Sequence, residues 1–160
     1  MRGCFSYGVV CPHLFQDKST LQAEEPDKVC SVGIASGSFE ASARFKLRCC
    51  GIALETFPYA TSSDTPRRRD IISLAAFRAG FDLTSVVYFA DGPWDHRASV
   101  ALGIPMIGIG RSYESLLEIG VQHTFQDYME PMRIIEVLSE LVKNVPKEAL
   151  HPITQTAHSR

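Results

Sequence analysis

The sequence lacks a long apolar run, a large excess of charge of one sign and a regular cysteine pattern. No apolar stretch approaches the roughly 18 residues that a membrane-spanning helix needs. Among 160 residues, 16 lysines and arginines oppose 18 aspartates and glutamates, so there is little surplus positive charge to neutralise a nucleic-acid backbone. We therefore expect neither a membrane nor a nucleic acid as a partner.

The cysteines exclude two further classes of protein. There are five, including the adjacent pair Cys49 and Cys50, and none forms a Cys-x-x-Cys pair. An odd number with this spacing argues against a disulfide framework, and the missing pairs argue against a zinc site. The first residues show no secretory cleavage pattern. We expect reduced thiols and a cytoplasmic location.

What is present is the composition of an ordinary globular domain, 45% hydrophobic and 21% charged. From Val29 onward, short apolar segments alternate with longer segments of helical periodicity. The short segments, such as residues 86–90, are apolar at every position, which is typical of parallel strands buried on both faces. The pattern predicts an α/β fold, a three-layer Rossmann-like parallel sheet with helices on both faces.

The order of these segments divides the chain into three parts. We predict an atypical N-terminal segment (1–28), a core (29–145) and a C-terminal tail (146–160). For the N-terminal segment, both disorder and a replaced first strand are open. The expected strands span residues 29–35, 57–60, 86–90, 105–109 and 121–125. The expected helices span residues 40–50, 66–80, 96–102, 114–119 and 134–145.

Two acidic residues follow the strand expected at residues 86–90. Asp91 and Asp95 are separated by Gly92-Pro93-Trp94, and a tight turn into a helix would let their carboxylates converge. Mg²⁺ binds a few carboxylate oxygens and completes its shell with water and phosphate. On spacing alone, the alternative is that Asp91 forms an Asx-turn and Asp95 caps the next helix.

Two other segments indicate a binding site for an anion. Ser36-Gly37-Ser38 follows a buried strand and offers hydroxyls and main-chain N–H groups, which can bind phosphate, although a plain turn with Ser38 as N-cap is the alternative. Arg67-Arg68-Arg69 opens a helix, where positive charge opposes the macrodipole. This placement hints at a nearby anion, while a solvated helix end also explains it.

Together, residues 32–131 resemble the haloacid-dehalogenase-like (HAD) hydrolase superfamily, in its phosphoglycolate-phosphatase-like branch. The most specific segment runs from Val87 through Asp91-Gly-Pro-Trp-Asp95 to Gly110. The resemblance implies a Mg²⁺-dependent phosphomonoester phosphatase acting on a small phosphorylated metabolite. It implies that Asp91 and Asp95 hold the metal, that Ser36 and Gly37 bind the phosphoryl group, and that a neighbouring arginine offsets its charge. That arginine is Arg68, with Arg67 and Arg69 as alternatives.

One element of the resemblance is missing. The family's nucleophile lies in an Asp-x-Asp motif after an apolar strand, and nothing before Val29 supplies it. The strand-like stretch at residues 5–10 is followed by Cys11 and His13, and a thiolate is a poor Mg²⁺ ligand. There is also no segment for a helical cap domain. We expect an impaired catalytic core; the alternatives are a non-catalytic remnant that binds phosphate or metal, or a module whose sheet a partner subunit completes.

Overall fold

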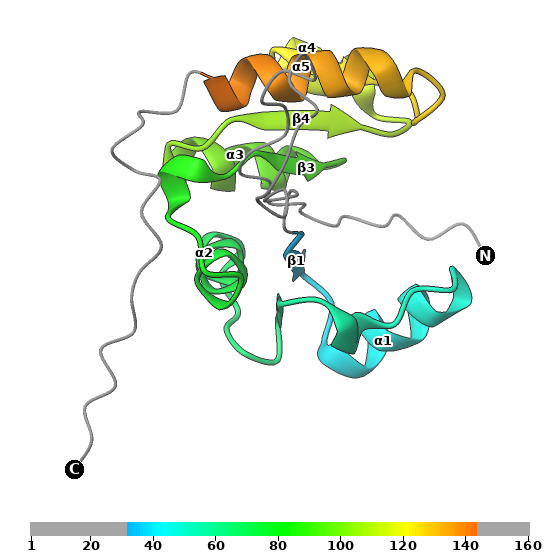
Figure 1. Cartoon of the computed structure of the whole chain (residues 1–160), viewed down its shortest axis with the longest axis vertical. Coiled ribbons are helices and arrows are strands. Elements are labelled where there is room, and N and C mark those ends of the chain that lie inside the picture. Colours follow the sequence, from blue (N-terminus) through cyan, green and yellow to red (C-terminus); the bar gives the residue numbers. More distant parts are fainter. Residues whose placement is uncertain (1–31, 144–160) are drawn as a thin grey trace, which may run out of the picture.

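Five strands alternate with five α-helices along residues 32–143, the part of the chain that the computed structural model describes (Figure 1). The strands are β1 (Ile34–Ser36), β2 (Tyr59–Thr61), β3 (Tyr88–Ala90), β4 (Met106–Ile109) and β5 (His123–Phe125). The α-helices are α1 (Glu40–Cys49), α2 (Arg68–Arg78), α3 (Pro93–Leu102), α4 (Tyr113–Glu118) and α5 (Pro131–Lys143). Short 3-10 turns, η1 (Leu54–Thr56) and η2 (Leu83–Ser85), precede β2 and β3.

The strands form two parallel sheets. In the first, β1 pairs with β2, with Ile34 opposite Tyr59. In the second, β4 lies between β3 and β5, with Ile107 opposite both Phe89 and His123. The predicted α/β class and the parallel pairing are confirmed, but the described strands form two sheets rather than one. Within residues 32–143, β1 and β3 each pair on one edge alone.

Helices cover both faces of these sheets, because alternate strand residues point in opposite directions. Ile34 packs with Leu47 of α1, while Val87 and Phe89 pack with Leu138 of α5. A third cluster joins the two sheets across α2 and α3. It contains Ala35 and Ala60 from the first sheet, Tyr88 and Ala90 from the second, and Ile71, Ile72, Ala75 and Ala98 from the helices.

Three helices begin two or three residues away from the prediction, among them α5, which begins at Pro131 and not at residue 134. α3 begins at Pro93, three residues early, because Gly92 acts as N-cap and proline suits the first helical position. α2 begins at Arg68 and not at Pro66. The carboxylate of Asp64, in the loop before this helix, accepts from the Thr61 N–H at 2.8 Å.

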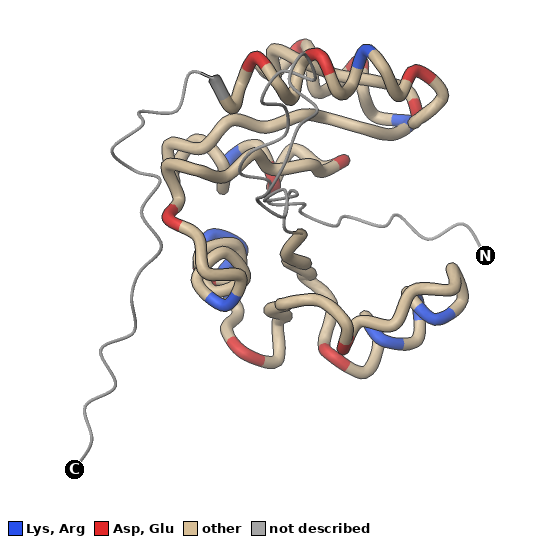
Figure 2. Tube along the Cα trace, in the orientation of Figure 1, with Lys and Arg blue, Asp and Glu red and all other residues tan. Residues whose placement is uncertain are grey.

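The helix ends agree with the glycines in the sequence. Gly103, for example, ends α3 in the left-handed conformation with φ +67°, which glycine adopts without strain. Basic and acidic residues are distributed over the helices of both sheets (Figure 2). No helix within residues 32–143 is both long and apolar enough to cross a membrane. The predicted segments 1–28 and 146–160, with Cys11 and His13, lie outside the described residues.

Candidate functional site

The start of α2 lies between the turn after β1 and the turn after β3. The Arg68 guanidinium packs against Gly37, where an added Cβ would stand 2.7 Å from Arg68 Nη1. The same guanidinium forms an ion pair with Asp95, with Nε 2.8 Å from Asp95 Oδ1. Three of the residues predicted for the site are therefore neighbours in space, although they come from separate parts of the chain.

The other two arginines of the basic run lie elsewhere. Arg67 is the exposed N-cap residue of α2, and Arg69 is exposed and pairs with the adjacent Asp70 at 3.3 Å. Arg68 is mostly buried, with 18% of its side chain exposed. Of the three candidates, Arg68 is thus the one in contact with Gly37 and Asp95.

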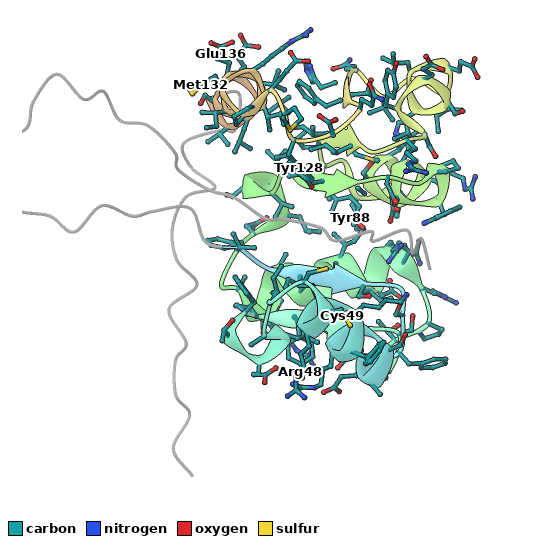
Figure 3. The ribbon with its side chains drawn as sticks, turned by 90° about the vertical axis from the view of Figure 1, so that its right-hand side faces the viewer. Arg48, Cys49, Tyr88, Tyr128, Met132 and Glu136 are labelled. Carbon is teal, nitrogen blue, oxygen red and sulfur yellow. The ribbon has the colours of Figure 1, made fainter. Side chains whose placement is uncertain are left out.

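Asp95 is fully buried, and the oxygen that faces Arg68 also accepts a hydrogen bond. The Tyr88 hydroxyl donates to Asp95 Oδ1 at 2.9 Å, and Tyr88 has no exposed surface. Figure 3 shows the position of Tyr88 in the interior of the structure. A buried carboxylate is costly unless it is paired and hydrogen-bonded, and here a guanidinium and a phenol meet that requirement. Burial, followed by the negative charge of Asp95, raises the pKa of Tyr88 well above its usual value, so the phenol remains a donor.

Arg68 retains donor capacity on the side of Gly37. Its Nη1 is buried and, within the described part of the chain, has no hydrogen-bond partner. A buried N–H without an acceptor costs free energy comparable to a lost hydrogen bond. An anion next to Gly37 would supply the missing acceptor.

The turn after β1 carries a second cation. Ser36 is buried, and its Oγ accepts from the Ser38 N–H at 3.2 Å. Ser38 does not cap α1, since Phe39 is the N-cap residue; its Oγ instead accepts from Lys46 Nζ at 3.1 Å. Lys46 was not identified from the sequence as a residue of the site. Its position about two turns into the helix that follows Ser38 is the sequence feature that could have indicated it.

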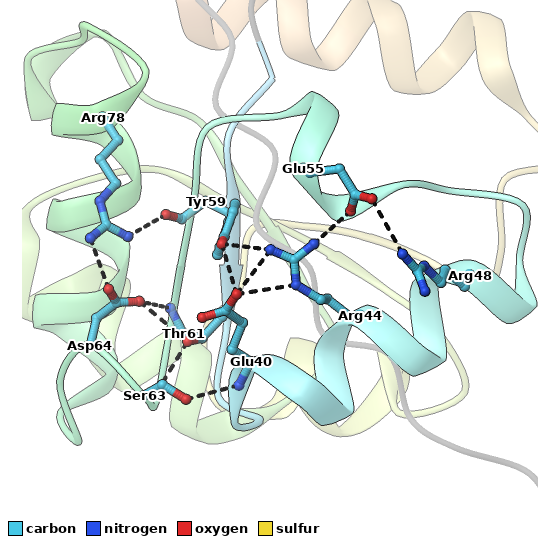
Figure 4. A network of polar contacts seen from close by, with 9 residues as sticks. All are labelled: Glu40, Arg44, Arg48, Glu55, Tyr59, Thr61, Ser63, Asp64 and Arg78. Atoms are coloured by element: carbon cyan, nitrogen blue, oxygen red, sulfur yellow. Dashed lines mark hydrogen bonds and ion pairs between the residues drawn. The ribbon is translucent and has the colours of Figure 1, made fainter.

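The loop after β2 fixes this turn in place. Ser62 donates through Oγ to the Gly37 carbonyl at 2.8 Å and through its N–H to the Ser38 carbonyl at 3.1 Å. Ser63 Oγ accepts from the first N–H of α1, that of Glu40, at 2.9 Å. Figure 4 shows how this contact continues into a network of carboxylates and arginines that joins α1, η1, β2 and α2. The turn is therefore held from outside as well as by its own residues.

Asp91 ends β3 in a half-buried position beside the loop after β4. An added Cβ on Gly110 would lie 3.3 Å from the Cβ of Asp91. Tyr128 lies within its electrostatic reach: the side chain is 65% exposed, but partial desolvation of the phenol and then the negative charge of Asp91 raise its pKa. Asp91 and Asp95 therefore have different surroundings, although one turn separates them in sequence.

These surroundings fit Mg²⁺ in part. No group of three or more histidines, cysteines and acidic residues among residues 32–143 is placed to hold a metal ion. Asp95 Oδ1 already pairs with Arg68 and accepts from Tyr88, and both Asp95 and Asp91 carry the carboxylate oxygens that Mg²⁺ prefers. With one or two carboxylates, Mg²⁺ draws its remaining ligands from phosphate and water. Metal binding by Asp91 and Asp95 stays a prediction.

The comparisons with known proteins leave the family open. No model of a known protein family matches this chain, and no curated protein matches it. The resemblance to the HAD superfamily therefore stays a prediction based on the residues named above, and the activity is argued below from the site itself.

Proposed function

We propose that this chain is a HAD-like hydrolase core of the phosphatase type, with the three-layer Rossmann-like architecture of that family. In this proposal, a phosphomonoester or inorganic phosphate binds between the turn after β1 and Arg68. The observation that supports it is the buried, unpartnered Nη1 of Arg68 against the main chain of Gly37. A guanidinium beside the exposed residue Gly37 suits a phosphate, whose oxygens accept in several directions.

The charges near the turn favour the same ligand. Asp95 pairs with Arg68 through Nε, which keeps the guanidinium in place and leaves Nη1 to an incoming oxygen. Lys46, hydrogen-bonded to Ser38, adds positive charge on the other side of the turn. Mg²⁺, when bound through Asp91, would offset further charge on the phosphate oxygens.

We propose that the chain binds phosphate but hydrolyses phosphomonoesters only slowly. The sequence has no Asp-x-Asp motif after an apolar strand before Val29, so the carboxylate that would attack phosphorus is missing. Positioning and charge neutralisation dominate phosphoryl transfer, but neither breaks the ester without a nucleophile. We expect at most trace release of phosphate from an aryl phosphate in the presence of Mg²⁺. Robust release that Asp91→Ala abolishes would contradict this part of the proposal.

Titration of the full chain with inorganic phosphate, with and without Mg²⁺, tests the binding. Trp94 is the single tryptophan, and its ring packs over Gly92 next to Asp95, so its fluorescence is a local reporter alongside calorimetry. We expect Arg68→Ala to weaken binding by about tenfold or more, which corresponds to a charged hydrogen bond. Arg69→Ala is the matched control and should change affinity less than about twofold. Equal affinities for the two variants would overturn the proposal.

A second candidate is an interaction module whose sheet a partner completes, and the edges of β1 and β3 favour it. The N–H groups of Ile34 and Tyr88 donate to the neighbouring strands, so Ala35 and Phe89 direct their main-chain groups to the opposite edges. Hydrogen exchange at Ala35 and Phe89 distinguishes the candidates. Fast exchange in the purified chain favours the partner-dependent module, and exchange as slow as at Ile107 contradicts it.

A further inference from the structure

We propose that Tyr88 is a positioning residue, which acts through Asp95 to aim the Arg68 guanidinium at the turn after β1. This inference rests on the proposed function and assigns phosphate affinity to a side chain that does not reach the anion site itself. Three groups meet at one atom, because Arg68 Nε and the Tyr88 hydroxyl both lie within 2.9 Å of Asp95 Oδ1. The structure thus links strand β3 to the start of α2 through a single carboxylate oxygen.

The tyrosine is the rigid member of this chain of contacts. Its main-chain N–H donates to the Pro105 carbonyl at 2.9 Å, so the residue is fixed within the second sheet. The strand around it is otherwise apolar, with Val86, Val87, Phe89 and Ala90 all buried. A phenol in such a strand needs a buried acceptor, and Asp95 provides it.

The phenol determines how Asp95 can hold Arg68. A carboxylate free to rotate forms the bidentate pair with a guanidinium, in which two nitrogens face two oxygens. With Tyr88 bound at Oδ1, Arg68 approaches that oxygen with Nε at 2.8 Å, and Nη1 lies against Gly37 without a hydrogen-bond partner among the described residues. Without the hydroxyl, the carboxylate can turn to the bidentate arrangement with Nη1 and Nη2. That arrangement releases Nε and draws the guanidinium away from the turn.

Tyr88→Phe tests this mechanism, because it removes the hydroxyl and keeps the ring in the core. Tyr59→Phe is the matched control, since the Tyr59 hydroxyl also donates at 2.9 Å to a carboxylate, that of Glu40, which pairs with Arg44 and not with Arg68. The contact of Glu40 with the loop after β2 runs through its main-chain N–H, which this substitution leaves in place. We expect Tyr88→Phe to weaken the binding of inorganic phosphate by the full chain by about three- to tenfold, the range for loss of one hydrogen bond. Tyr59→Phe should leave the affinity within about twofold.

A double-mutant cycle separates positioning from a general structural effect. Arg68→Lys keeps the charge but has no fork to aim, so Tyr88→Phe should change affinity less than about twofold in that background. An undiminished loss in the lysine background would overturn the inference, as would unchanged affinity of Tyr88→Phe in the otherwise native chain.

A measurement without phosphate distinguishes failure of this inference from failure of the proposed function. The Arg68 Nε–H proton, observed by NMR, should exchange with water at least about threefold faster in Tyr88→Phe than in the native chain and unchanged in Tyr59→Phe. If the native chain binds no phosphate, the proposed function and the role of Tyr88 in affinity both fail, while faster exchange still supports the positioning of Arg68. Unchanged exchange overturns the positioning itself.

Discussion

Leu116 of α4 packs directly onto the main chain of Gly108 in β4, so that a Cβ added to Gly108 would stand 2.8 Å from Leu116 Cδ1. Thr124 Cγ2 of β5 would be 3.1 Å away from the same position. The central strand of the second sheet therefore has room for hydrogen alone at this residue, and α4 lies close to the sheet because of it.

Gly108→Ala is expected to destabilise the fold by about 1–3 kcal/mol, the usual cost of overpacking a core. Urea unfolding monitored by circular dichroism measures it. Gly33→Ala is the control, because its Cβ would meet the Ala75 carbonyl at 3.4 Å, an ordinary contact. We expect a change within about 0.5 kcal/mol there, and equal losses in both variants would contradict this account of the packing.

Leu138 fastens α5 to the second sheet. It is 6% exposed and packs with Val87, Phe89 and Ile107. Leu138→Ala should cost about 2–5 kcal/mol of unfolding free energy, from lost burial and the cavity left behind. On the same helix, Met132 is 68% exposed and points outward in Figure 3, so Met132→Ala should change stability by less than about 0.5 kcal/mol. A similar loss in both would show that α5 is not held by this face.

Asp64 should make stability depend on pH. Donation from Arg78, followed by the Thr61 main-chain N–H, lowers the pKa of Asp64 below its usual value in the folded state. The stabilisation is therefore fully present above the unfolded-state value of about 3.9 and is lost as pH falls through the lower folded-state pKa. Asp64→Asn should be less stable than the native chain at neutral pH.

The gap between Asp64→Asn and the native chain should close toward about pH 2, where the native carboxyl is protonated. Chemical unfolding of both proteins across this range measures it. Asp70→Asn is the control, because that side chain is exposed and pairs with the adjacent Arg69 on the same surface turn. A stability difference between Asp64→Asn and the native chain that does not change with pH would contradict this prediction. It would show that the loss comes from altered packing and not from loss of the negative charge.

Gly37→Ala should affect binding more than folding. The added Cβ would meet the end of the Arg68 side chain, 2.7 Å from Nη1, and that flexible end can move aside because Gly37 is exposed. We expect phosphate affinity to fall by about threefold or more, which matches loss of one hydrogen bond. The thermal midpoint should change by less than about 3 °C, consistent with a surface substitution. Unchanged affinity would show that the guanidinium position is unimportant.

The sequence pattern predicted the alternation of elements and the helix ends, because both depend on local rules. Gly103 shows this for α3, where a residue with positive φ was needed. The start of α3 was misplaced because Gly92-Pro93 suits both a turn and a helix N-terminus. For the candidate site, the sequence predicted which residue types gather at the strand ends. It did not predict that Asp95 binds Arg68 and Tyr88, since those contacts depend on how α2 packs against both sheets.

The division of the strands into two sheets also bears on how the molecule unfolds. Each sheet has its own apolar cluster, around Leu47 for the first sheet and around Ile107 for the second. A third cluster spans both sheets and includes residues of α2. Cooperative melting of the described residues then depends on this shared cluster, in which Ile71 and Ile72 are the largest side chains of α2, and on the Arg68–Asp95 ion pair. Trimming either isoleucine side chain should separate the melting of the half around β1 and β2 from that of the half around β3, β4 and β5.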